Sequence, residues 1–303
     1  MPATLATGSS LTAPLTYFGG TKNGEKSYIL QYKHDVLPPN NFTQDKVEVP
    51  IHDLRPALAD PKLRSQISTD STGFGYVEPD LAKTEMEYED WENEERIRGH
   101  YYNEVTELLK KVTGGSRVII FDHTIRRGDP PGVTTPDTAN SRKPVQGVHV
   151  DQTPLSGSRR VLRHAKEQGL DGEQLLRGRV QLINVWRPLR APALDMPLAF
   201  CDSRTVDKEK DLVYSRLLYP PPGQPGHQVE GETFNVKHNE NHVWYYLPDI
   251  GPQEVLLLKC WDNTSDVLTP HTAFAHPQFY GKEDVPPRQS IEIRALVFHP
   301  PEE

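Results

Sequence analysis

The chain has 303 residues, of which 35% are hydrophobic and 25% charged, and its formal net charge is -8 at pH 7. This length and composition predict a globular protein with a sizeable core and exclude a largely disordered chain. The negative charge argues against a nucleic-acid-binding face, because contacts with the phosphate backbone require concentrated positive charge. The Arg126–Arg127 and Arg159–Arg160 pairs are isolated, and we interpret both as solvated charge.

Cysteine content and hydropathy bear on the compartment. The two cysteines, Cys201 and Cys260, form no CxxC pair and no zinc-type spacing, so they are expected to be small buried residues of a protein in a reducing compartment. No apolar run approaches the roughly 18 to 20 residues that a membrane span requires. The first residues lack the basic start and the apolar stretch of a secretory signal. We therefore predict a cytoplasmic protein that does not bind membranes.

The first part of the chain predicts short strands followed by one long helix. Residues 1–80 contain β-branched and aromatic segments interrupted by Pro, Gly and Asn, as extended segments and loops do. From about Asp80 to Thr113, apolar residues recur at spacings of three and four, with charged residues between them. This period predicts an amphipathic helix that ends at Gly114 and supports a sheet.

The second part predicts a core rich in strands. A strand over 116–127 precedes a loop of Pro, Gly and Thr over 128–143, and loops of this length often cover a site. A short strand at 147–154, a helix within 156–176 and a buried strand at 179–189 follow. Seven further strand-like segments complete the chain: PLAFCDSRTV, DLVYSRLLYP, GETFNVKHN, HVWYYLPD, EVLLLKCWDN, HTAFAHPQF and SIEIRALVFHP. Many short strands predict a mainly β sandwich or jelly roll with flanking helices, in a single domain.

Three side chains of this region are predicted to bind a metal ion. His149 and Asp151 are two residues apart in a short predicted strand, so they project from the same face. His271 in TPHTAF is the candidate for the next imidazole, and His276 is the second choice. Two histidines and one carboxylate on one face of an iron leave positions open for a co-substrate and dioxygen. The alternative for the HxD pair is a surface histidine beside a turn-forming aspartate.

Successive blocks of the sequence resemble one group of oxygenases. In order within residues 115–299, the blocks are GVHVDQTP, LINVWRPL, PLAFCDSRTV, DLVYSRLLYP, HVWYYLPD, LLLKCWDN, TPHTAF and PPRQSIEIRALVF. The group includes the fungal gibberellin desaturase, the small hydroxylase component of cephamycin biosynthesis and many secondary-metabolism enzymes. The resemblance implies a double-stranded β-helix, the cupin-like jelly roll. Residues 1–303 are then one oxygenase domain, with an N-terminal extension and support helix in 1–115 and the jelly-roll core in 116–299.

The resemblance implies an enzyme that uses Fe(II), 2-oxoglutarate and dioxygen to hydroxylate or desaturate a small molecule, such as a secondary metabolite. Carried over to this chain, the HxD block corresponds to His149 and Asp151, and the PHTAF block to His271. Two alternatives stay open. One is a non-catalytic or partner subunit that retains the fold; the other is a jelly-roll metal dioxygenase that works without 2-oxoglutarate. A homodimer is also left open.

Two arginines compete to anchor the distal carboxylate of 2-oxoglutarate. Arg288, Ser290 and Arg294 have the same parity, so they share one face of the last strand. Arg288 and Ser290 resemble an R-x-S pair that binds this carboxylate in a related oxygenase group. Antiparallel pairing places Arg294 near the metal and Arg288 about 20 Å further along, at roughly 3.3 Å per residue. Spacing therefore favours Arg294, with Arg288 second.

Four further residues are weaker candidates for the wall of the substrate pocket. Asn184, Trp186 and Arg187 lie together in the NVWRP segment, where a role in the core or at a strand end is an equal alternative. His123 lies in the strand predicted over 116–127.

Overall fold

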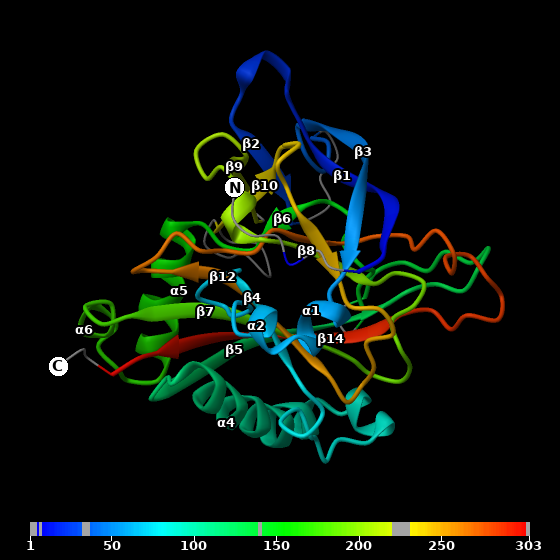
Figure 1. The fold of residues 1–303 in the computed structure, drawn as a ribbon. Helices are drawn as coiled ribbons and strands as arrows, with labels where there is room; N and C mark the ends of the chain where they lie inside the picture. The colour runs from blue at the N-terminus through cyan, green and yellow to red at the C-terminus, as the bar shows by residue number, and fades with distance from the viewer. Residues whose placement is uncertain (1–4, 6–7, 32–36, 139–140, 220–230, 301–303) are drawn as a thin grey trace.

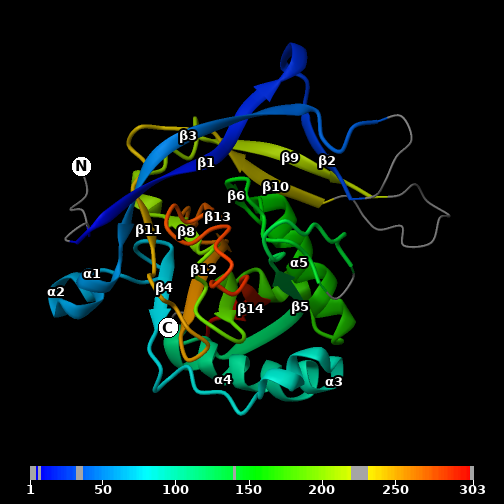
Figure 2. The same cartoon turned by 90° about the vertical axis from the view of Figure 1, so that its right-hand side faces the viewer.

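The computed structural model describes residues 5, 8–31, 37–138, 141–219 and 231–300 of the chain. Two β-sheets face each other, and helix α4 lies against the five-stranded one (Figures 1 and 2). The strands are β1 Ser10–Thr21, β2 Ser27–Leu30, β3 Phe42–Asp53, β4 Phe74–Val77, β5 Arg117–Arg127, β6 His149–Val150, β7 Val180–Pro188, β8 Leu198–Cys201, β9 Leu212–Leu218, β10 Gly231–Val236, β11 Trp244–Tyr246, β12 Val255–Asp262, β13 His271–Ala273 and β14 Gln289–Phe298. The α-helices are α1 Arg55–Ala59, α2 Pro61–Arg64, α3 Glu94–Arg96, α4 Tyr102–Thr113, α5 Pro154–Glu167 and α6 Gly172–Leu175.

The order of strands places segments from distant parts of the chain side by side. The nine-stranded sheet runs β1-β3-β11-β8-β13-β6-β10-β9-β2, and the five-stranded sheet runs β4-β12-β7-β14-β5. In the larger sheet β6 lies between β13 and β10 and pairs antiparallel with both. In the smaller sheet β14 lies between β7 and β5, again antiparallel. The predicted mainly β architecture with flanking helices is confirmed.

Every residue of β7 is buried, because the five-stranded sheet is covered on both faces. Ile183 and Val185 face outward and pack in one cluster with Val105 and Leu109 of α4. Leu182 and Trp186 have the opposite parity and belong to the two apolar clusters between the sheets. Residues of even number in β7 and β14 therefore face the nine-stranded sheet.

The long helix predicted from Asp80 begins later than expected. A 3-10 turn over Tyr88–Glu92 precedes α3, and a π-helical turn over Ile97–Tyr101 joins α3 to α4. Asn93 caps α3, because its side chain accepts hydrogen bonds from the backbone of Glu95 and Arg96. Gly114 ends α4 in the left-handed conformation, as predicted (φ 74°). Among the described residues, no helix is both long enough and apolar enough to cross a membrane.

Two bulges interrupt the five-stranded sheet on either side of one inward-facing pair. Asn184 of β7 lies opposite Arg294 of β14. Beside Arg294, strand β5 carries one extra residue, Phe121, and beside Asn184, strand β12 carries one extra residue, Cys260. A bulge bends its strand and changes the direction of neighbouring side chains. This part of the sheet is therefore shaped around Asn184 and Arg294.

Strands of the first 115 residues extend both sheets. β1 and β3 pair along their length at one side of the nine-stranded sheet, and β3 also pairs with β11. β4 pairs with β12 at one edge of the five-stranded sheet. Thr16 of β1 bridges to Gly147, two residues before His149. The predicted extension thus joins the sheets that carry the candidate site, and the division at residue 115 stays a prediction.

Candidate metal centre

His149 and His271 form a cross-strand pair. They lie directly opposite each other in the antiparallel strands β6 and β13. Residues in this relation project from the same face with their β-carbons about 4.5 to 5.5 Å apart. The centres of the two imidazole rings are 4.5 Å apart. The register of two strands separated by more than a hundred residues therefore brings the two predicted histidines together.

Asp151 completes the cluster. It follows His149 by two residues, and its Oδ1 lies 3.3 Å from His149 Nε2. One ligand atom from each of His149, Asp151 and His271 lies within 4.8 Å of the other two. The second-choice histidine, His276, is elsewhere: its ring stacks on Phe279, and it lines a separate cavity.

The hydrogen bonds of the two imidazoles select the tautomer that a metal needs. His149 Nδ1 lies 2.8 Å from the carbonyl oxygen of Gly147, and His271 Nδ1 lies 3.0 Å from that of Thr269. A carbonyl oxygen only accepts hydrogen bonds, so Nδ1 carries the proton in both rings. Each Nε2 then has a lone pair for a metal ion, and the backbone contact fixes the ring orientation.

One oxygen of Asp151 is already engaged. Asn184 Nδ2 donates a hydrogen bond to Oδ2 at 2.7 Å, and Arg294 Nε donates another at 3.2 Å. Oδ1 is the oxygen that faces His149. The two donors come from the five-stranded sheet and the histidines from the nine-stranded sheet. The carboxylate is thus held so that one oxygen remains for a metal.

The charge states of Asp151 and His271 suit a divalent cation. Burial raises the pKa of Asp151, but the charge of Arg294 and the two histidines outweigh it and hold the pKa well below its ordinary value. Burial lowers the pKa of His271, and the neighbouring His149 lowers it further. For His149, the contact with Asp151 outweighs burial, and the pKa is raised. The group offers a charged carboxylate and a neutral imidazole, which are the forms that bind metals.

Arg294, the first choice for the anchor, is surrounded by acceptors. Besides Asp151, its guanidinium forms ion pairs with Glu292 and Asp122 and donates a hydrogen bond to Thr124 Oγ1 at 2.9 Å. These acidic groups outweigh burial and raise its pKa. Arg294 lies at the level of the three candidate ligands, as predicted. The N–H groups of its guanidinium already donate hydrogen bonds to side chains of the protein.

Arg288 is in the opposite situation. It is only 3% exposed, and its guanidinium donates to Ser290 Oγ at 3.1 Å and to the carbonyl oxygen of Met196 at 3.0 Å. No carboxylate of the described residues forms an ion pair with it. The guanidinium carbon lies 5.0 Å from the centre of the Trp186 ring. Trp186 is two residues, about 7 Å, along β7 from Asn184, so the guanidinium contacts a side chain that is close in the strand to a partner of Asp151.

The interpretation of Arg126 as solvated charge is wrong. Arg126 is opposite Ser290 in the β5–β14 register, so it shares the inner face with Arg288. It is half-buried, and it donates a hydrogen bond to the carbonyl oxygen of Lys143 at 2.9 Å. Burial lowers the pKa of Arg126 and of Arg288, and in Arg288 the charge of Arg126 adds to this. The parity of Arg126 in its strand is the signal that could have identified it.

Two of the weaker pocket candidates face away from the cluster. Arg187 has the outward parity of β7, and it donates hydrogen bonds to Tyr101 Oη and to backbone carbonyls. His123 is opposite Ile293 on the outer face, and its Nδ1 lies 2.8 Å from Tyr102 Oη. Asn184 and Trp186 have the inward parity, and of the four only Asn184 contacts a candidate ligand.

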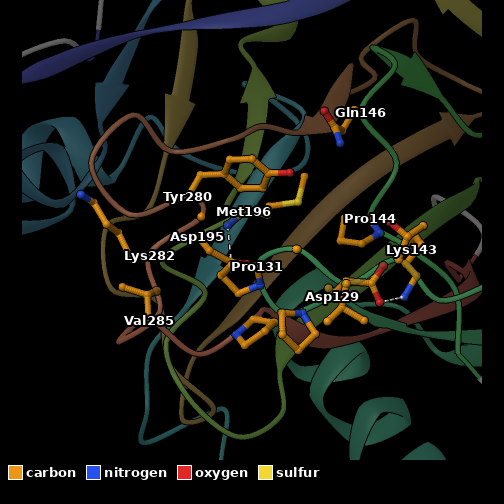
Figure 3. Close-up of a pocket in the computed structure, with 17 residues that line it drawn as sticks. Asp129, Pro131, Lys143, Pro144, Gln146, Asp195, Met196, Tyr280, Lys282 and Val285 are labelled. Carbon is orange, nitrogen blue, oxygen red and sulfur yellow. Dashed lines mark hydrogen bonds and ion pairs between the residues drawn. The ribbon is translucent and has the colours of Figure 1, made fainter.

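A cavity of about 600 Å³ lies at the end of the site where Arg288 is found. Its wall combines residues of the segments 128–134, 143–146 and 280–287 with Asp195 and Met196 (Figure 3). Asp195 and Met196 also accept hydrogen bonds from the backbone N–H and the guanidinium of Arg288, respectively. Figure 3 also shows the ion pair of Asp129 and Lys143 that joins the two ends of the predicted 128–143 loop. That loop therefore forms part of a cavity wall.

Comparison with known proteins identifies the family. Residues 15–298 match the family model described as YDMC: Oxidoreductase/YMDC permease-like domain. The chain is 30% identical to hydroxylase/desaturase efuI of Hormonema carpetanum over 95% of both chains, and 32% identical to the Fe(II)/2-oxoglutarate-dependent dioxygenase nvfI of Aspergillus novofumigatus over 85% of both. The chain belongs to the Fe(II)/2-oxoglutarate-dependent dioxygenase family. The recognition made from the sequence blocks is confirmed.

A solved structure supports the same assignment for the fold. The iron and alpha-ketoglutarate-dependent endoperoxidase NvfI superposes with a TM-score of 0.77 at 28% sequence identity, covering 96% of this chain and 98% of that one. The jelly-roll class predicted for this dioxygenase-family chain is therefore confirmed.

Proposed function

We propose that this protein oxidises a small-molecule substrate with Fe(II), 2-oxoglutarate and dioxygen, and that His149, Asp151 and His271 are the iron ligands. The observation that carries the proposal is the set of two imidazole nitrogens and one carboxylate oxygen, all within 4.8 Å of one another. Relatives of the chain are named hydroxylase/desaturase or alpha-ketoglutarate-dependent dioxygenase. The enzyme class and cofactors predicted from the sequence are those of the family. Hydroxylation or desaturation of a secondary metabolite is the proposed reaction.

The residues of the chain would position the reactants. Iron with its co-substrates supplies the oxidant that removes hydrogen from the substrate. His149, Asp151 and His271 would hold the iron, and a set of two histidines and one carboxylate would leave room for 2-oxoglutarate and dioxygen. Asn184 and Arg294 donate hydrogen bonds to Asp151 Oδ2, so the carboxylate would present Oδ1 alone to a metal. The backbone carbonyls of Gly147 and Thr269 keep both rings aimed at the same point.

We propose Arg288, with Ser290, as the anchor for the distal carboxylate of 2-oxoglutarate, in place of Arg294. A buried guanidinium without a carboxylate partner is costly, and a planar carboxylate satisfies it by two parallel hydrogen bonds. Arg294 already donates to Asp151, Glu292 and Thr124. The contact of Arg288 with Trp186, a residue two positions along β7 from Asn184, supports this choice, because the anchor of a short diacid has to lie near the metal.

Anaerobic titration tests the proposal directly. Addition of Fe(II) and then 2-oxoglutarate to the purified protein should produce the visible charge-transfer absorption of the chelate, and succinate should form only when oxygen is admitted. His149→Ala and Asp151→Ala should abolish both signals, because each removes one of three ligands. The exposed His238 lies outside the cluster, so His238→Ala should behave as the wild type. Full succinate formation by either ligand variant would overturn the proposal.

The two alternatives make different predictions in the same experiment. A non-catalytic subunit would give neither absorption nor succinate, although the complete ligand set speaks against it. A dioxygenase independent of 2-oxoglutarate would bind iron but show no change on addition of the diacid. The absence of a carboxylate partner for the guanidinium of Arg288 among the described residues speaks against that. For localisation we propose a reducing compartment such as the cytoplasm, supported by the two buried, unpaired cysteines.

A further inference from the structure

A second cavity, of about 420 Å³, has the candidate ligand Asp151 in its wall. Much of the remaining wall comes from α5, the helix that begins three residues after Asp151. Leu162 of α5 and Leu217 of β9 contribute apolar surface to it. A molecule in this cavity would lie beside Asp151, one of the three residues that would hold the metal.

The cavity wall carries more positive than negative charge. Its cationic residues are Arg159, Arg160, Arg163 and Lys166 of α5, and its acidic residues are Asp151 and Glu232. Both acids are engaged: Asp151 receives hydrogen bonds from Asn184 and Arg294, and Glu232 Oε2 receives one from Thr153 Oγ1 at 2.9 Å. Among the cations, only Arg163 forms an ion pair within the described part of the chain, and its partner is Glu167.

Arg160 is the cation with the most defined position. It is half-buried, so its interpretation as solvated charge is wrong, whereas Arg159 beside it is exposed as predicted. Its guanidinium carbon lies 5.3 Å from the centre of the Phe121 ring, and Phe121 also stacks on His164 of α5. Burial lowers the pKa of Arg160 and the charges of Arg163 and Arg294 add to this, while Tyr219 and Asp122 act in the opposite direction. An aromatic ring thus contacts a half-buried guanidinium that forms no ion pair with the described residues, and a bound anion would supply one.

We infer that this cavity binds the substrate, and that the substrate is an amphipathic carboxylic acid whose carboxylate is bound by Arg160. The apolar part of the molecule would lie against Leu162 and Leu217. The planar guanidinium matches a carboxylate by paired hydrogen bonds, and its stacking on Phe121 leaves its N–H edge available. The inference rests on the proposed function only in that Asp151 is taken as a ligand of the reacting metal.

Calorimetry with a matched pair of probes tests the inference. The full-length protein, saturated with 2-oxoglutarate and Mn(II), is titrated with 4-phenylbutanoate and with the neutral 4-phenylbutanamide. The acid should bind more tightly than the amide in the wild type. Arg160→Gln should weaken binding of the acid by about tenfold or more, since a hydrogen bond to a charged group is lost, and should leave binding of the amide unchanged. Arg177→Gln, an exposed arginine beyond the cavity, should retain the wild-type preference.

Equal binding of acid and amide by the wild type would overturn the inference, and so would an undiminished preference in Arg160→Gln or its equal loss in Arg177→Gln. The comparison of acid with amide uses the wild type alone, so it remains a test even if Arg160→Gln fails to fold. Failure of the proposed function is distinct: the chelate absorption would be absent, while binding of the acid could still depend on Arg160.

Discussion

At the residue scale, two of the three candidate metal ligands can be predicted from their spacing in the sequence. The two-residue spacing of His149 and Asp151 places them on one face of any strand, so this pair could be predicted. The partner His271 was identified only by its sequence block, because its register opposite His149 depends on strands that are far apart in the chain. His276 lies in a similar short segment of sequence. Only the folded structure shows that it is apart from His149 and Asp151.

The ranking of the two arginines shows what spacing leaves out. Counting residues along β14 measures backbone distance and ignores the direction of a long side chain. It also ignores the acids that neutralise Arg294, since Asp122 and Asp151 belong to other strands. The parity that places Arg288, Ser290 and Arg294 on one face was predictable; the partners of each side chain were not.

The role of Arg288 can be measured through the co-substrate. Arg288→Gln should raise KM for 2-oxoglutarate by about tenfold to a hundredfold, because a hydrogen bond to a charged group contributes about 1.5 to 3 kcal/mol. Arg288→Lys retains the charge without the two-pronged geometry, so its KM should be intermediate. Arg294→Gln removes a donor to Asp151, and its main effect should be weaker metal binding. Initial rates of succinate formation measure all three variants. A raised KM for 2-oxoglutarate in Arg294→Gln, with an unchanged KM in Arg288→Gln, would identify Arg294 as the anchor.

At the scale of elements, the sequence pattern predicts the positions of the strands better than it predicts bulges and the start of the long helix. The seven late segments predicted as strands contain β8 to β14, in order. The late start of the long helix was missed, because apolar side chains near Trp91 keep a helical period in short turns that are not α-helical. The bulges at Phe121 and Cys260 were also missed, since a bulge is defined by the partner strand. These bulges lie where the site needs inward-facing polar groups.

The contact of α5 with β12 gives a test of element packing. A β-carbon on Gly157 would lie 2.3 Å from Cδ2 of Trp261, so the helix approaches the strand as closely as glycine allows. Gly157→Ala should lower the free energy of unfolding by about 1 to 3 kcal/mol, which is typical of an overpacked core. Gly99→Ala is the matched control, because its β-carbon would meet nothing within 4 Å and alanine favours a helix. Urea unfolding measures both; equal stabilities would contradict the close approach.

At the scale of the whole molecule, the candidate ligands connect the two sheets. His149 and His271 belong to the nine-stranded sheet, and Asp151 is held by Asn184 and Arg294 of the five-stranded sheet. The sequence predicted the sheet-rich class and the strand order along the chain. Their order within the sheets depends on pairings such as β6 with β13, which no local pattern contains. Metal binding should therefore stabilise the folded protein as a unit.

The stabilisation expected from metal binding can be calculated, and variants of the candidate ligands show which residues it depends on. A metal present at a hundredfold excess over its dissociation constant adds about 2.7 kcal/mol to the free energy of unfolding. For a chain of 303 residues, with an unfolding entropy of about 2.1 cal/mol/K per residue, this raises Tm by about 4 °C. Mn(II), which tolerates air, should produce this shift in the wild type and in His276→Ala, and calorimetric scans should show its absence in His271→Ala. A shift that persists in His271→Ala and disappears in His276→Ala would mean that His276, and not His271, is the metal ligand. The site described here would then not be the one on which the oxygenase mechanism depends.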